Sequence, residues 1–158
     1  MGLTLARAGP SGPIGPIGLT GPQGNGTVVV WHAHESGFPP ASSSCTDWAG
    51  ANITINVTGP GLVVVQGNAL VYVSHVIETP DVGYLYIQND TNPCTGVYST
   101  FTVPSSIDST VLLETLPANG VFHVAGPGED TFIVMDMATT GGDVSFSYIS
   151  LVAVFYPT

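Results

Sequence analysis

The chain contains no lysine and only one arginine, Arg7, among its 158 residues. Eleven aspartate and glutamate residues oppose that single cation, and the formal net charge is −10. Proteins that bind nucleic acids, nucleotide phosphates or anionic membranes rely on lysine and arginine to neutralise the phosphate groups. The composition therefore excludes nucleic acid as a partner and argues against phosphate chemistry and anionic membrane surfaces.

Long apolar runs and catalytic motifs are missing as well. No apolar segment approaches the ~20 residues needed to cross a bilayer, so we expect no membrane insertion. The sequence has no G-x-S-x-G turn, no phosphate-binding loop and no H-E-x-x-H helix, and we expect no enzyme activity. A pair of carboxylates for glycoside hydrolysis stays open as an alternative, because such a pair is defined by its separation in space.

The N-terminus also lacks the apolar core of a secretory signal. Residues 1–9 read MGLTLARAG and include one arginine. We therefore expect no signal peptide here. Either the chain is a piece of a longer protein, or it reaches its destination without the general secretory route.

Cysteine is scarce, with Cys45 and Cys94 as the two examples. Neither has a second cysteine close enough for a zinc or redox motif. Pairing the two closes a loop of about 50 residues, which stabilises a fold by roughly 4 kcal/mol in the chain-entropy estimate. We predict an intrachain disulfide and an oxidising, extracellular setting; two free thiols in a reducing cytosol are the alternative.

Glycine, by contrast, recurs with a strict period near the N-terminus. Residues 9–26 read GPSGPIGPIGLTGPQGNG, with Gly9, Gly12, Gly15, Gly18, Gly21 and Gly24 three apart. Only glycine fits at the axis of three polyproline II chains wound together, and the prolines that follow four of these glycines favour that extended form. The segment resembles collagen and implies a homotrimer. A flexible linker is the alternative, but it needs no exact period.

The third position of each triplet never holds proline, whereas animal collagens rely on hydroxyproline there. The segment is therefore more similar to the collagen-like proteins of bacteria and their viruses. Six triplets without hydroxyproline are too few to hold three chains together. We expect a globular domain to trimerise and to bring the three chains into register.

The chain divides into an N-terminal tail at residues 1–8, a collagen-like stalk at 9–26 and a head at 27–158. The head is rich in valine, threonine, isoleucine and aromatic residues, broken by glycine, proline, asparagine and aspartate. This pattern of strand-forming and turn-forming residues predicts an all-β jelly-roll-like sandwich with about ten short strands. The expected strands are 27–34, 53–58, 62–66, 69–77, 83–88, 97–103, 110–116, 120–126, 131–137 and 144–156, with PANG at 117–120 as one of the turns.

The last expected strand is apolar on both faces. Val152, Val154 and Tyr156 alternate with a second apolar set. A strand of this kind must be covered on both sides, by the opposite sheet and by another subunit. We predict that the second set forms the trimer interface: Ile149, Leu151, Ala153 and Phe155.

The order of stalk and head resembles collagen-like proteins capped by a trimeric jelly roll of the C1q/TNF type. Residues 142–157, GDVSFSYISLVAVFYP, are similar to that family's closing strand, and residues 61–76, GLVVVQGNALVYVSHV, occupy the place of its long central hairpin. The cysteine pair departs from the family pattern. An unrelated β-rich trimer, such as a phage tail-fibre tip, is the alternative.

The sharpest polar cluster is WHAHE at residues 31–35. His32 and His34 share a face if the segment is a strand, and with Glu35 or Asp47 they form a candidate zinc, copper or nickel site. Two ordinary surface histidines are the alternative interpretation. We expect no other cofactor than a metal.

Two acidic loops are candidate ligands for Ca²⁺ if they meet in space. One contains Glu129 and Asp130, the other Glu78 and Asp81. The resemblance to C1q-like heads favours calcium, whereas two separate solvated loops are the simpler alternative.

These observations predict a structural and adhesive protein outside the cell, on a cell, spore or virion surface. Its head trimerises, nucleates the stalk and presents a tip to a glycan or a protein receptor. The alternatives are a secreted C1q/TNF-like recognition or signalling ligand and a phage tail-fibre tip.

Overall fold

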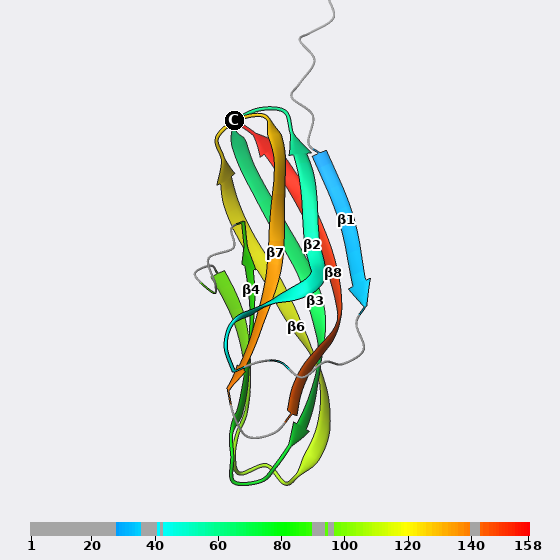
Figure 1. Ribbon diagram of the computed structural model, residues 1–158, viewed down its shortest axis with the longest axis vertical. Helices are drawn as coiled ribbons and strands as arrows, with labels where there is room; N and C mark the ends of the chain where they lie inside the picture. Colours follow the sequence, from blue (N-terminus) through cyan, green and yellow to red (C-terminus); the bar gives the residue numbers. More distant parts are fainter. Residues whose placement is uncertain (1–27, 36–40, 42, 90–93, 95–96, 140–142) are drawn as a thin grey trace, which may run out of the picture.

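The computed structural model describes residues 28–35, 41, 43–89, 94, 97–139 and 143–158 (Figure 1). The collagen-like stalk and its six glycines lie outside the described residues. Within the described part, the secondary structure consists of eight β-strands. They are β1 (Val28–Glu35), β2 (Thr46–Val57), β3 (Gly61–His75), β4 (Asp81–Gln88), β5 (Val97–Val103), β6 (Thr110–Val124), β7 (Gly128–Thr139) and β8 (Asp143–Pro157).

The strands form two four-stranded sheets with the orders β1-β8-β3-β6 and β2-β7-β4-β5. All pairs are antiparallel, and each strand pairs with its counterpart counted from the other end of the chain: β1 with β8, β2 with β7, β3 with β6 and β4 with β5. This nested pairing is the topology of a jelly roll. The all-β, jelly-roll-like sandwich predicted from the sequence is confirmed.

The core lies between the two sheets and is built from alternating residues of each strand. In β3 every second residue from Gly61 to His75 is buried, except Gly67, which is half-buried. The core includes the buried aromatic side chains of Trp48, Phe132, Phe146 and Phe155. Strand alternation is therefore the physical origin of both the core and the outer faces.

The sequence predicted about ten strands, and the structure has eight because two expected turns lie inside long strands. Pro117–Gly120 continues β6, opposite Val65–Asn68 of β3. Proline is tolerated there because β6 is an edge strand. In β3, Gly67 has no Cβ, and a Cβ at this position would collide with the carbonyl oxygen of Ser150. The turn prediction at 117–120 is wrong.

The sandwich has a proximal and a distal end, which different strand ends define. At the proximal end Val28 lies opposite Phe155, and Gly61 lies opposite Pro157 and Val124. At the distal end β3 and β5 finish while β4 and β6 begin, and the connections at this end form the lower tip of the molecule in Figure 1. Among the described residues, no helix has the length and apolar character to span a bilayer.

Candidate functional site

The candidate site is the outer face of the β1-β8-β3-β6 sheet, the side turned away from the second sheet. Four of its large apolar side chains are about 60% exposed: Val29, Trp31, Leu113 and Val121. Among the side chains that the structure describes, this outer face contains no aspartate, glutamate, lysine or arginine. The described part of this face is therefore uncharged, on a chain with net charge −10.

Four valines form one continuous row across the outer face, one from each strand. Val29 of β1 pairs with Val154 of β8, Val154 pairs with Val64 of β3, and Val64 pairs with Val121 of β6. Branched residues directly opposite one another on a sheet pack closely. The row lies in the proximal half of the sheet, close to the residue at which β1 begins.

Below the valine row, the side chains that the structure describes on the outer face include several neutral polar groups. A hollow of about 430 Å³ lies there, lined by Gln66, Gly67, Asn68, Pro117, Asn119, Ser150 and Val152. At its border the indole Nε1 of Trp31 donates a hydrogen bond of 3.4 Å to Ser150 Oγ. The outer face therefore combines apolar area with neutral hydrogen-bonding groups near its centre.

The structure corrects the predicted trimer interface. Ile149, Leu151, Ala153 and Phe155 are 0% exposed and belong to the core of their own chain. They pack against the second sheet, so they are unavailable to another subunit while the sandwich is closed. Periodicity identified the two faces of β8 correctly but assigned the wrong one to the interface, because both faces are apolar.

The cysteine prediction is confirmed: Cys45 and Cys94 form a disulfide, with Cα atoms 6.0 Å apart. The bond joins the residue before β2 to the connection between β4 and β5. It therefore braces the β2-β7-β4-β5 sheet, at a place where neither cysteine lies in a strand.

His32 and His34 do share one face of β1, but that face points into the sandwich. Their partners Leu151 and Ile149 in β8 are core residues. His32 Nε2 donates to the carbonyl oxygen of Gly50 at 3.2 Å, and the His34 ring lies edge-on to Trp48, with centroids 6.1 Å apart.

Both histidines are half-buried, and each contacts a residue of β2. Within the described residues no group of three or more His, Cys, Asp or Glu side chains is placed to hold a metal ion. His32 and His34 pack against residues near the start of β2, namely Gly50 and Trp48.

The two acidic loops lie at opposite ends of the sandwich and do not meet. Glu129 and Asp130 begin β7 opposite the end of β2, at the proximal end. Asp81 is fully buried at the distal end, where its Oδ2 lies 2.5 Å from His75 Nδ1. Glu78 is in the turn before it, with a positive φ of 75°. The structure therefore does not assemble the shared calcium site.

One buried carboxylate has a shifted pKa. Asp136, 8% exposed in β7, accepts a hydrogen bond of 3.0 Å from Thr46 Oγ1. Burial raises the pKa of Asp136, the hydrogen bond from Thr46 lowers it, and the nearby charge of Asp47 raises it further. The net effect is a raised pKa, because burial is the largest influence.

Sequence reasoning missed two features of the described residues. One is the buried pair of His75 and Asp81, whose contact depends on the turn between β3 and β4. The other is a cluster of Tyr84, Tyr86 and Tyr98 on the outer face of the second sheet, with centroids 5.3–6.3 Å apart. Burial, followed by the neighbouring tyrosines, raises the pKa of Tyr86. The cluster was recognisable only in part, because Tyr98 comes from a separate strand.

No protein-family model and no curated protein matches the sequence. Among solved structures, the chain is similar to "Structure of Eiger TNF from S. frugiperda", with 12% identity, a TM-score of 0.38, and coverage of 72% of this chain and 92% of that chain. It is also similar to "Structure of infectious bursal disease virus Gx strain", with 14% identity, a TM-score of 0.35 and coverage of 92% of this chain. The chain spans 37% of that viral chain. The jelly-roll assignment rests on the strand order, since both TM-scores are below 0.5.

Proposed function

We propose that this protein is a structural and adhesive surface protein whose head trimerises through the outer face of the β1-β8-β3-β6 sheet and nucleates a collagen-like stalk. The observation that carries the proposal is a sheet face whose described side chains are apolar or neutral, on a strongly acidic molecule. Exposed apolar patches of this kind mark protein–protein contacts. Three copies with net charge −10 each associate only through a surface that keeps their carboxylates apart.

The position of the stalk supports the same arrangement. The last repeat glycine, Gly24, precedes β1 by only a few residues in the sequence. β1 begins at the proximal end, next to the valine row. Three copies meeting along the valine row bring their three β1 strands together, and so bring the ends of three stalks into register.

The test is the native mass of the full chain, measured by light scattering after gel filtration. We expect about three times 16.2 kDa for the natural sequence. Val121→Glu places a charge in the valine row and should give a monomer. Val76→Glu is the matched control, because Val76 is 49% exposed just beyond the end of β3 at the distal end, whereas the valine row crosses the proximal half of the sheet. A monomeric natural chain, or equal dissociation by both variants, would overturn the proposal.

A second candidate function is glycan binding at the tyrosine cluster. Tyr98 is 54% exposed and adjoins Tyr84 and Tyr86, so aromatic area is open on the outer face of the second sheet. Aromatic rings present an apolar body with a polar hydroxyl, a surface suited to sugar rings. A glycan array probed with the natural chain and with Tyr98→Ala tests it, and binding that survives the substitution contradicts this location. A secreted C1q/TNF-like ligand differs in requiring a protein receptor instead of a glycan.

A further inference from the structure

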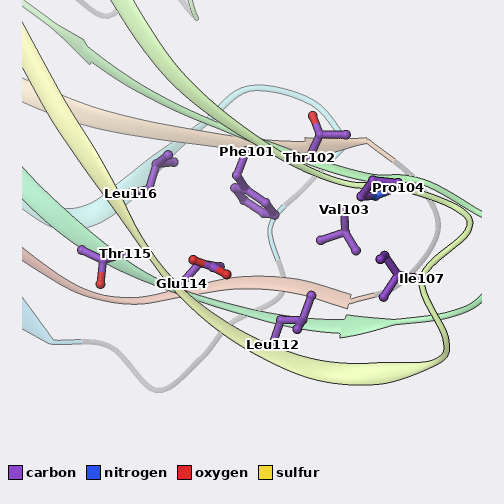
Figure 2. Close-up of a pocket in the computed structure, with 9 residues that line it drawn as sticks. All are labelled: Phe101, Thr102, Val103, Pro104, Ile107, Leu112, Glu114, Thr115 and Leu116. Carbon is purple, nitrogen blue, oxygen red and sulfur yellow. The ribbon is translucent and has the colours of Figure 1, made fainter.

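A pocket near the distal end lies between the two sheets and belongs to neither outer face. Its volume is about 300 Å³, and it opens where β5 and β6, the edge strands of the two sheets, approach each other. Figure 2 shows its lining: Phe101, Thr102, Val103, Pro104, Ile107, Leu112, Glu114, Thr115 and Leu116. Pockets of this size that combine apolar walls with a few polar groups are typical ligand sites.

The walls are mainly apolar, and one ionisable residue stands among them. Phe101 and Val103 come from β5, and Leu112 comes from β6. Glu114, two residues after Leu112, is the single ionisable group among the described lining residues. The chain offers no lysine and no arginine among its described residues to neutralise it. A group that fills the pocket therefore meets apolar carbon and an unopposed negative charge.

The distal rim of the pocket is held in place by buried groups. Ile107 lies in the β5–β6 connection, and its carbonyl oxygen accepts a 3.1 Å hydrogen bond from His75 Nε2. His75 is held in turn by Asp81, and both side chains are fully buried. The backbone of the same connection also bonds to the β3–β4 turn, from Glu78 N to the Ser105 carbonyl at 2.9 Å. A rim fixed in this way is pre-organised for binding, which lowers the entropy cost.

The geometry points to a binding site for a lysine or arginine side chain of a partner protein, flanked there by apolar residues. The aliphatic stem of such a side chain packs on Leu112 and Ile107, as long cationic side chains do on apolar surfaces. Its charged head pairs with Glu114, and Phe101 in the same lining provides an aromatic ring for cation–π attraction.

The charge of the site selects against other partners. Glycans are neutral or acidic and provide no cation for Glu114, and the head groups of anionic lipids are repelled by it. This site is therefore distinct from the tyrosine cluster and independent of the proposed trimer face, because it opens at the edge between the sheets.

The test uses the full chain and three fluorescently labelled peptides, Ala-Leu-Arg-Leu-Ala and its Gln and Glu counterparts at the central position. Fluorescence anisotropy at low salt measures their affinities. We expect the arginine peptide to bind about threefold to tenfold more tightly than the glutamine peptide, and the glutamate peptide to bind most weakly. Glu114→Gln should remove the preference for arginine.

Glu129→Gln is the matched control, because it removes another exposed carboxylate, at the proximal end. It should leave the preference unchanged. Ile107→Ser should weaken the binding of the arginine and glutamine peptides alike. If Glu114→Gln lowers the melting temperature, Ile107→Ser is the variant that tests the site. The proposal is wrong if arginine and glutamine peptides bind equally to the natural chain, if no peptide binds at millimolar concentration, or if Glu129→Gln acts like Glu114→Gln.

Discussion

His75 and Asp81 form a fully buried pair at the distal end of the sandwich, with Nδ1 and Oδ2 2.5 Å apart. Because the carbonyl of Ile107 can only accept, His75 Nε2 must donate to it, and the pair shares one proton between Nδ1 and the carboxylate. The two residues come from the end of β3 and the start of β4. Through the bond from His75 to Ile107, the pair connects the β3–β4 turn to the β5–β6 connection.

The contact between His75 and Asp81 should stabilise the folded protein. Asp81→Ala should lower the free energy of unfolding by about 3–5 kcal/mol, since it leaves a buried imidazole without its partner. The double variant His75→Leu with Asp81→Ala should cost less than the sum of the two single variants, because neither group is then left alone. Urea denaturation of the four proteins measures this coupling. Additive effects would show that the contact contributes nothing.

Asp136 gives a prediction with a defined pH dependence. Its pKa is raised in the folded state, so the folded protein binds more protons than the unfolded one as pH rises above the ordinary value of 3.8. The ionised carboxylate therefore destabilises the fold at neutral pH. Asp136→Asn should raise the melting temperature at pH 7, while Thr46 can still donate to the amide oxygen.

The gain from Asp136→Asn should vanish at about pH 3, where the carboxyl group is protonated in both states. Glu129→Gln, at an exposed site, serves as the control and should change stability little at either pH. An equal gain for Asp136→Asn at both pH values would show that the burial of charge is not the cause.

The disulfide should make a large contribution to stability. Replacing Cys45 and Cys94 by serine is expected to lower the free energy of unfolding by about 2–5 kcal/mol, because the unfolded chain gains the freedom of an open loop. Guanidinium denaturation with and without reductant provides the measurement. The contrary result is a natural protein that loses no stability on reduction, beside a serine variant that is destabilised. That result would show that the serine side chains, and not the lost bond, lower the free energy of unfolding.

Neighbouring residues of β8 should differ in their roles. Leu151→Ala opens a cavity in the core and is expected to cost about 2–5 kcal/mol in the free energy of unfolding. Val152→Ala trims the outer face, so we expect a smaller loss of stability and a weaker trimer. Thermal unfolding combined with native mass at several protein concentrations separates the two effects. A larger loss of stability from Val152→Ala would place the core on the other face of β8.

The sequence alone determined the fold class, because period-2 patterns depend only on the identity of neighbouring residues. It also determined the cysteine pair and the absence of cationic residues for binding phosphates. It predicted that β8 has two apolar faces and that His32 and His34 share a side. Each of these conclusions rests on composition or on local spacing.

Only the tertiary structure decided which face is which. Ile149 and Val152 are both apolar, and nothing local to β8 shows which of them meets the second sheet. Strand pairing across the chain settles it, by placing Val29, Val64 and Val121 beside Val154 on the outside. Likewise Glu114 and Phe101 line the same pocket only because β5 and β6 are edge strands of the two sheets that lie close together. Contacts between strands far apart in sequence depend on register, and a one-residue shift would exchange the two faces.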